Sequence, residues 1–254
     1  MSMPGAVSRR QALKRGLQLV LGTVALFGAG RWLAGYASST RRGSGNGSSP
    51  PLVRASGGGI CTLAAEQEEG PFFVDEGLLR ADVRQGQPGV PLALSIKLVN
   101  ARTCMPLAGA AVDIWSASHT GKYTDETEEG TIGLKFFRGV QITDPQGMVH
   151  FKTIYPGWYS DRTCHIHLKV RTGGTVAGST YRSSGSKEAH SGQLFFPEVL
   201  NEQLRTVYKQ NLNSFINNSD DGVYADEDGV AAVLSLKGSM AAGYTTGITL
   251  GVKV

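Results

Sequence analysis

The sequence lacks a hydrophobic run long enough to cross a membrane as a helix. The apolar stretch near the N-terminus covers residues 16–30 and ends at Arg31, which is short of the roughly 20 residues that a bilayer requires. Charged residues are few, at 18% of the 254 residues, whereas glycine is abundant at 34. This balance favours short strands and many turns over long charged helices. The 41% of hydrophobic residues suffice for a buried core.

Acidic residues are absent from the first 56 positions, where eight of the 25 basic residues lie. The remaining 17 basic residues face all 21 acidic ones, so the rest of the chain carries a net charge of −4. The overall charge of +4 therefore comes from the N-terminal segment and does not indicate a basic patch. We expect no nucleic acid among the partners of this protein.

The N-terminal segment has the order of an export signal. Arg9 and Arg10 precede an apolar run at residues 17–27, and small residues follow at 35–38. The arginine pair resembles the twin-arginine signal, whose usual pattern has Phe where Ala12 stands. This order predicts export through the cell's export machinery to the cell envelope or the extracellular space, with cleavage after Ala37. An uncleaved signal would instead tether the protein to the membrane.

The composition divides the chain into three parts. Residues 1–37 are the predicted signal, and residues 38–59 are rich in Ser, Gly, Pro and Arg, which predicts a flexible linker with little to bury. Residues 60–254 are the predicted folded domain. No cysteine lies near the predicted cleavage site, which argues against a lipoprotein.

The folded domain is predicted to be all-β. Strand-like patterns occur at residues 92–99, 110–115, 147–154, 165–171, 230–236 and 245–254. One helix is expected, at residues 201–215. The sum predicts a β-sandwich with long loops and one short C-terminal helix.

Two histidines alternate with apolar residues in the segment at 165–171. Side chains alternate across a strand, so His165 and His167 project from one face, while Ile166, Leu168 and Val170 project from the other. Two imidazoles so placed can bind one metal ion, although a hydrogen-bonded structural pair would have the same spacing. Just upstream, a Pro-Gly turn brings a tyrosine and an arginine to the same edge of the predicted sheet.

Three short motifs occur in one order along the chain: Gly-x-Tyr at 121–123, Pro-Gly-Trp-Tyr at 156–159 and Arg-x-x-His-x-His at 162–167. Through these motifs the sequence resembles the intradiol ring-cleavage dioxygenases, the family of catechol and protocatechuate dioxygenases. The resemblance covers most of residues 61–197. It also includes the segments at 69–72, 106–115, 137–139 and 143–147.

The resemblance implies a non-haem Fe(III) cofactor and a set of site residues. The implied iron ligands are Tyr123, Tyr159, His165 and His167. The arginine three residues before the first histidine matches Arg162, and a glutamine after the histidine strand matches Gln193. In relatives these two residues line the substrate pocket.

The chemistry of ferric iron agrees with this ligand set. Fe(III) favours anionic oxygen and can remove the proton of a phenol, whose free pKa is about 10. In the family a catechol displaces one tyrosinate, here Tyr159, which can accept a substrate proton. Arg162 is expected to stabilise negative charge on the ring. O₂ is the co-substrate, and oxygen enters between the two hydroxyl-bearing carbons to give a muconate-type dicarboxylate.

Three cysteines are an odd number, and export to an oxidising space favours one disulfide with one thiol left over. We expect the bond between Cys61 and Cys104. Cys164 precedes His165 and should point to the opposite face of the strand, as a buried thiol.

Other candidate residues receive structural interpretations. We expect His119, His150 and His190 to be surface or hydrogen-bonding residues. The acidic residues between 220 and 228 do not have the spacing of an EF-hand and are read as a solvated loop. Trp115 is expected in the core, while Trp158 is either in the core or a pocket wall.

Two other functions compete with ring cleavage. One is a non-enzymatic extracellular β-sandwich module that binds a partner, which would not need two tyrosines and two histidines together. The other is a zinc-dependent hydrolase that uses His165, His167 and a carboxylate.

Overall fold

The computed structural model describes residues 52–54, 60–210 and 212–254. The chain divides into two units, Met1–Ser49 and Pro50–Val254, and all described residues belong to the second. The predicted export signal and most of the predicted linker therefore lie outside the described residues. Among the described helices, none combines the length and the apolar content needed to cross a bilayer.

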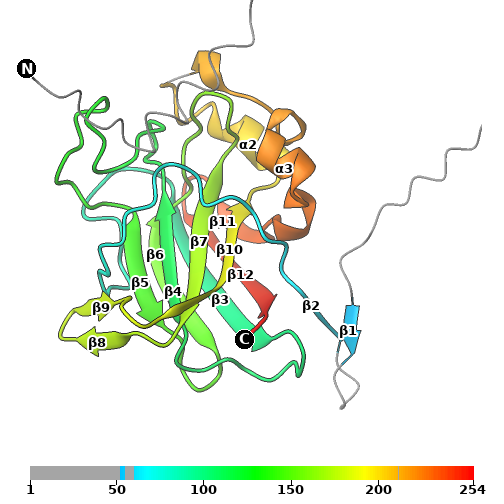
Figure 1. Ribbon diagram of the computed structural model, residues 1–254. Coiled ribbons are helices and arrows are strands. Elements are labelled where there is room, and N and C mark those ends of the chain that lie inside the picture. Colours follow the sequence, from blue (N-terminus) through cyan, green and yellow to red (C-terminus); the bar gives the residue numbers. More distant parts are fainter. Residues whose placement is uncertain (1–51, 55–59, 211) are drawn as a thin grey trace, which may run out of the picture. The chain divides into compact units, whose positions relative to one another are not determined.

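Two four-stranded sheets form the body of the domain (Figure 1). The first has the order β10 (Lys187–Phe195), β7 (His165–Thr172), β4 (Ala111–Ser116) and β5 (Arg138–Ile142). The second has the order β11 (Leu236–Ser239), β12 (Gly243–Val252), β3 (Pro91–Asn100) and β6 (Met148–Ile154). Neighbouring strands are antiparallel, except that β12 runs parallel to β3.

Two short hairpins complete the strands, namely β1 (Leu52–Arg54) with β2 (Ile60–Thr62) and β8 (Thr175–Ala177) with β9 (Thr180–Arg182). In the second sheet, β3 buries every other side chain over most of its length, from Leu92 to Leu98. These side chains share one core with apolar residues of the first sheet, including Val112, Ile114, Ile166 and Leu168. Both sheets thus bury one face against the other, and the predicted all-β sandwich is confirmed.

The helices gather near one end of the sandwich (Figure 1). They are α2 (Glu198–Leu204), α3 (Gly222–Asp226) and the 3₁₀ turns η1 (Leu212–Ser214), η2 (Asn218–Asp220) and η3 (Gly229–Ala232). The predicted helix at 201–215 is wrong in its bounds, because the chain leaves the α-helix after Leu204. Thr206 donates its hydroxyl to the Gln203 carbonyl, and the amide of Val207 bonds the carbonyl of Leu204 instead. Side-chain to backbone bonds of this kind compete with helix continuation.

The strand predicted at 230–236 is also wrong. Its first three residues belong to the turn η3, and β11 begins only at Leu236. Asp228 adopts a left-handed conformation with φ of 56°, which turns the chain before it can extend. The other predicted strands match β3, β4, β6, β7 and β12 within a few residues.

A disulfide joins Cys61 to Cys104, as predicted. Cys164 is the free cysteine of the described residues, and it is buried in the core between the sheets. Its side chain packs on the opposite face of β7 from the predicted histidines, which confirms the prediction. Trp158 also packs in this core.

Removing the disulfide should cost stability mainly through the unfolded chain. For a separation of 43 residues, the loop-entropy relation predicts a loss of about 4 kcal/mol for the double variant Cys61→Ser/Cys104→Ser. Denaturant unfolding of the oxidised wild type and the variant measures this difference. Cys164→Ala serves as the control for the loss of a thiol outside the disulfide. An unfolding free energy of the double variant within 1 kcal/mol of the wild type would contradict the expectation.

Candidate functional site

The site lies on the face of the first sheet that points away from the core. In this sheet, His167 of β7 stands opposite Trp115 of β4 and Gln193 of β10, and His165 stands opposite Phe195. Residues directly opposite each other in antiparallel strands share a face. The register therefore gathers these five side chains on one surface.

The two imidazoles point toward each other. The ring nitrogens Nε2 of His165 and His167 lie 3.0 Å apart. Nδ1 of His165 lies 2.7 Å from the carbonyl oxygen of Thr163, which can only accept, so Nδ1 holds the proton and Nε2 keeps a lone pair. The His167 ring is stacked on Trp115 with centroids 4.9 Å apart and planes 5° apart.

The backbone at Gly70 also approaches the His167 ring closely. A Cβ atom added to Gly70 would lie 3.2 Å from Cε1 of His167, and Gly70 has a positive φ of 73°. A larger residue at position 70 would be strained and crowded. Trp115 and Gly70 together fix the plane of the His167 ring.

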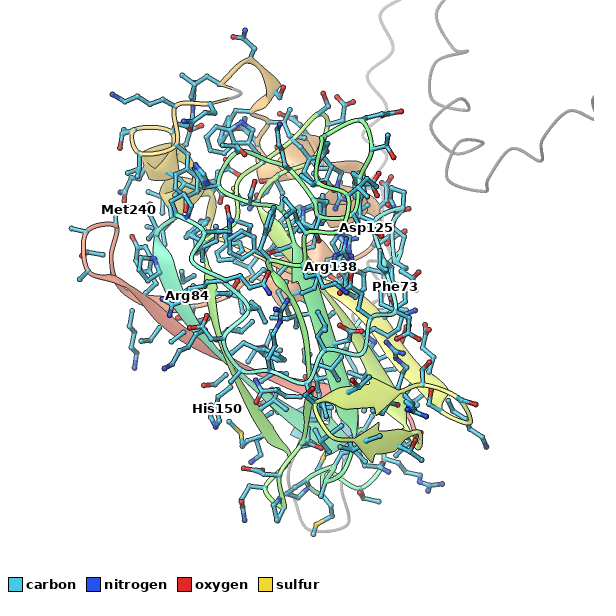
Figure 2. The ribbon with its side chains drawn as sticks, turned by 90° about the vertical axis from the view of Figure 1, so that its left-hand side faces the viewer. Phe73, Arg84, Asp125, Arg138, His150 and Met240 are labelled. Atoms are coloured by element: carbon cyan, nitrogen blue, oxygen red, sulfur yellow. A yellow bond between two sulfur atoms is a disulfide. The ribbon has the colours of Figure 1, made fainter. Side chains whose placement is uncertain are left out.

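Tyr123 enters the site from the loop between β4 and β5. Its amide donates to Oε2 of Glu129 at 2.6 Å, and its carbonyl accepts from the hydroxyl of Thr131 at 2.7 Å. Arg138 at the start of β5, labelled in Figure 2, donates to the hydroxyl of the neighbouring Thr124 at 2.5 Å. These bonds hold the loop, and the Tyr123 side chain is buried.

Tyr159 enters from the turn between β6 and β7, and a glycine explains why the two tyrosine loops meet. The amide of Gly157 donates to the carbonyl of Ser118 at 3.1 Å. A Cβ atom on Gly157 would lie 2.8 Å from that oxygen and 2.7 Å from the carbonyl oxygen of His119. Only glycine permits this approach, so the Pro-Gly-Trp-Tyr motif brings Tyr159 beside the loop that carries Tyr123.

The structure brings all four predicted ligands together. The hydroxyl oxygens of Tyr123 and Tyr159 lie 3.4 Å and 3.3 Å from Nε2 of His165. Donor atoms that share one metal ion at about 2 Å lie roughly 3 Å apart, so these spacings fit a single ion. Within the described residues, no group of three or more His, Cys, Asp or Glu side chains could hold a metal. The tyrosine oxygens are the further ligands that this position offers to a metal ion beside the two imidazoles.

Burial keeps this cluster neutral in the absence of a cation. It raises the pKa of Tyr123 well above 10, and the neighbouring Tyr159 adds to this effect. It also raises the pKa of Tyr159, although Arg162 opposes the shift. Burial, assisted by Arg162, lowers the pKa of His165 and of His167 well below 6.5. A highly charged cation would remove the protons of the two phenols and bind the phenolates together with the two neutral imidazoles.

Arg162 and Gln193 lie beside this cluster. Nη1 of Arg162 is 3.5 Å from the Tyr159 hydroxyl, and Nη2 donates to Oε1 of Gln193. Nε2 of Gln193 in turn donates to the carbonyl of Glu68 at 2.9 Å. Burial lowers the pKa of Arg162, but the surrounding Tyr159 and Asp221 outweigh this and leave the pKa raised. The guanidinium therefore stays charged.

The interpretation of the acidic residues at 220–228 as a solvated loop is wrong for Asp221. This carboxylate is fully buried and accepts from Nε of Arg162 at 2.9 Å and from the amide of Thr163 at 2.8 Å. It also caps α3 through the amides of Val223 and Tyr224. A charge that is paired and fully hydrogen-bonded can be buried, which the spacing of acidic residues does not reveal.

Two aromatic residues of the site escaped the sequence interpretation. Phe72 stacks on Tyr123 with centroids 4.3 Å apart, and Trp115, expected only in the core, stacks on His167. The alternation of β4 indicates this position of Trp115 in advance, because it places Trp115 on the face opposite to that of the core residue Ile114. His150 and His190 are hydrogen-bonding residues, as predicted, because Nδ1 of His150 bonds Ser95 and Nδ1 of His190 bonds Glu66. The prediction is wrong for His119, whose ring packs against Tyr208 and whose buried Nδ1 has no hydrogen-bond partner among the described residues.

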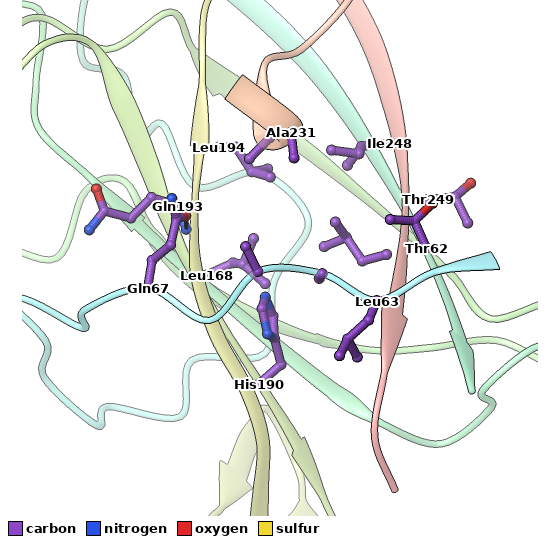
Figure 3. Close-up of a pocket in the computed structure, with 14 residues that line it drawn as sticks. Thr62, Leu63, Gln67, Leu168, His190, Gln193, Leu194, Ala231, Ile248 and Thr249 are labelled. Carbon is purple, nitrogen blue, oxygen red and sulfur yellow. Dashed lines mark hydrogen bonds between the residues drawn. The ribbon is translucent and has the colours of Figure 1, made fainter. Parts of the chain in front are cut away.

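A separate cavity of about 80 Å³ lies on the core side of the first sheet (Figure 3). Its lining includes Leu168, Leu194 and Ile248, together with His190. Leu168 and Leu194 alternate with His167 and Gln193 along their strands. Gln193 also belongs to the lining, together with Gln67, so the cavity adjoins the cluster of tyrosines and histidines at the edge strand β10.

Comparisons with known proteins agree with this arrangement. Residues 68–176 match the family described as Dioxygenase. A chlorocatechol 1,2-dioxygenase from Pseudomonas putida is 28% identical over 172 residues, which cover 55% of this chain and 64% of that protein. The chain thus spans less than two thirds of the length of this curated relative.

Solved structures extend the likeness to most of the domain. An intradiol ring-cleavage dioxygenase from Tetranychus urticae superimposes with a TM-score of 0.65 and 28% identity, covering 76% of this chain and 95% of that one. The dioxygenase domain of a dioxygenase carbohydrate-binding protein fusion from Streptomyces sp. SirexAA-E gives a TM-score of 0.54 at 25% identity, covering 76% and 99%.

The β-sandwich fold is shared with solved dioxygenases, and the outer face of this sandwich gathers two tyrosines and two histidines. More narrowly, the resemblance of the chain to the intradiol ring-cleavage dioxygenases is confirmed, since the family match, the curated relative and the solved structures all agree.

The ion pair between Arg162 and Asp221 should be essential for the stability of the site. Asp221→Asn would leave the buried guanidinium without its counter-charge, so we expect a loss of about 3–5 kcal/mol in the free energy of unfolding. Glu202→Gln, which breaks an exposed pair with Arg205, is the control and should change stability by less than about 1 kcal/mol. Equal effects of the two variants in denaturant unfolding would refute this assignment.

Proposed function

We propose that this protein cleaves catechol-type rings between the two hydroxyl-bearing carbons, using O₂ and a ferric ion held by Tyr123, Tyr159, His165 and His167. One carbon–carbon bond breaks, and both oxygen atoms of O₂ enter a muconate-type dicarboxylate. The observation that carries the proposal is the convergence of two phenol oxygens and His167 Nε2 within 3.0–3.4 Å of Nε2 of His165.

The chemistry of the donors supports ferric iron as the cofactor. Phenolates are hard anionic oxygen ligands, and neutral imidazoles suit iron as well. Because the buried cluster holds no carboxylate of its own, a trivalent cation would supply the charge that keeps both phenols ionised. When bound, ferric iron would offer a site for the two catechol oxygens and withdraw electrons from the ring.

The residues around the cluster would then bind substrate and move its protons. The phenolate oxygen of Tyr159 would accept a proton from a substrate hydroxyl. The guanidinium of Arg162, 3.5 Å from that oxygen, would stabilise negative charge on the substrate ring in a buried environment. Gln193 would hold Arg162 in place through its amide oxygen.

The alternatives have less support. A zinc hydrolase using His165 and His167 needs a third ligand, and no His, Cys, Asp or Glu group of that kind occurs among the described residues. Asp221, a buried carboxylate of this region, is paired with Arg162. A binding module without a metal would not require two phenol oxygens and two imidazole nitrogens to converge at one point.

Iron content and colour test the proposal directly. The purified protein should contain about one iron per chain and absorb visible light, because tyrosinate bound to Fe(III) is coloured, and catechol should shift this band before muconate forms under air. Tyr159→Phe should lower kcat by roughly 100-fold or more. Tyr244→Phe, a buried tyrosine of β12 in the other sheet, is the matched control. A colourless protein that binds zinc, or full activity of Tyr159→Phe, would overturn the proposal.

We also propose that residues 1–37 direct export and that the enzyme works in the cell envelope or outside the cell. The arginine pair before an apolar run supports this. The disulfide between Cys61 and Cys104 adds support, because such bonds persist in oxidising compartments.

Replacing the two arginines tests the export proposal. Arg9→Lys/Arg10→Lys keeps the charge but removes the pair that the twin-arginine pathway reads, so the protein should accumulate inside the cell. Immunoblots of cell fractions measure the distribution. Arg41→Lys/Arg42→Lys in the predicted linker is the control and should be exported normally. Normal export of the first variant would rule out a twin-arginine route.

A further inference from the structure

The four rings of the site are restrained to different degrees. Tyr123 is stacked face to face on Phe72, with centroids 4.3 Å apart and planes 12° apart, and His167 is stacked on Trp115 in the same way. Tyr159 makes edge contacts instead, at 86° to Phe72 and 83° to Tyr123. Among the ring contacts within the described part of the chain, Tyr159 has no face-to-face stack like that of Tyr123 on Phe72.

The segment that carries Phe72, residues 67–75, is here called the strap. Its anchors lie on both sides of Phe72. Before it, the Glu68 carbonyl accepts from Gln193 at 2.9 Å and Glu69 pairs with Lys169. After it, Asp75 pairs with Arg171 at 3.1 Å and accepts from the hydroxyl of Ser183 at 2.5 Å.

These anchors make the strap a rigid support. Arg171 is itself buried and also pairs with the buried Asp113 of β4 at 2.8 Å. The next aromatic residue of the strap, Phe73, packs on Trp115 with centroids 4.9 Å apart and lies 4.3 Å from Nζ of Lys169. Phe72 is thereby held over Tyr123 by contacts with the sheet.

The support of Tyr159 is of another kind. Its turn closes through a bond from the Arg162 amide to the Tyr159 carbonyl at 3.1 Å and contains Asp161 with a positive φ of 61°. The ring itself is held by its hydroxyl, which is 3.5 Å from Arg162 and 3.3 Å from His165. A bound ligand could replace these polar contacts of Tyr159 with contacts of its own. A movement of Tyr123 would instead require the loss of its stack on Phe72.

We propose that Phe72 is a positioning residue, which restrains the ring of Tyr123 by stacking on its face, a support that it does not give to Tyr159. The consequence for catalysis rests on the proposed function, because a site that must admit substrate has to release one side chain and keep the others. The restraint itself is a property of the metal-free chain.

Ring-flip rates of the two tyrosines in the metal-free protein test the restraint. With ¹³C-labelled tyrosine in the full chain, NMR exchange measurements should give a slower flip for Tyr123 than for Tyr159. The signals are assigned from the spectra of Tyr123→Phe and Tyr159→Phe. In Phe72→Leu, the flip of Tyr123 should accelerate roughly 2- to 10-fold, the range expected from the loss of one aromatic pair.

Two further variants make the test specific. Phe72→Tyr keeps the aromatic face and should keep the slow flip of Tyr123. Phe73→Leu removes the neighbouring ring of the strap, which packs on Trp115, and should leave the flip of Tyr123 unchanged. The proposal is overturned if Tyr159 flips as slowly as Tyr123, or if Phe72→Leu and Phe73→Leu have the same effect on Tyr123.

The iron-loaded protein gives a second measurement. In Phe72→Leu, the visible band of the resting enzyme should broaden, because Tyr123 would occupy several orientations, and Phe72→Tyr should restore its shape. An unchanged band in Phe72→Leu counts against the proposal. A wild-type protein that takes up no iron refutes the proposed function instead, and the ring-flip rates still decide the role of Phe72.

Discussion

The two-sided character of strand β7 is the constraint on which the rest of the structure depends. Ile166, Leu168 and Val170 enter the core between the sheets, so the alternation of a strand forces His165 and His167 onto the outer face. Burial of the apolar side fixes the register, since a slip of one residue would exchange the two faces. The free energy that folds the sandwich therefore also holds the two imidazoles side by side.

The outer face becomes a site only because loops cover it. Gly157 lets the turn of Tyr159 approach the loop of Tyr123, and Gly70 lets the strap lie directly over His167. The covered cluster is neutral by itself, with the pKa of both phenols raised and that of both imidazoles lowered by burial. In the function proposed above, a cation of high charge would ionise this cluster, and Arg162, beside the Tyr159 hydroxyl, would compensate charge on a bound ring.

Asp221 contributes both to the stability of the domain and to the geometry of the site. This buried carboxylate neutralises Arg162 and caps α3. The helices near one end of the sandwich are thereby joined to the site by an ion pair. An arginine that is fixed in this way loses little freedom when it meets a ligand, which is the preorganisation that electrostatic stabilisation requires.

The sequence by itself determined the strands with clear alternation, the face on which His165 and His167 lie and, through its motifs, the identity of the four converging residues. It did not determine β10, whose alternation is interrupted by a bulge between Glu188 and His190, or the end of α2, where the Thr206 hydroxyl bonds the Gln203 carbonyl. Only the tertiary structure decided the roles of Phe72, Trp115 and Asp221. Their partners lie on distant segments of the chain, and stacking or burial of a paired charge leaves no periodic pattern in sequence.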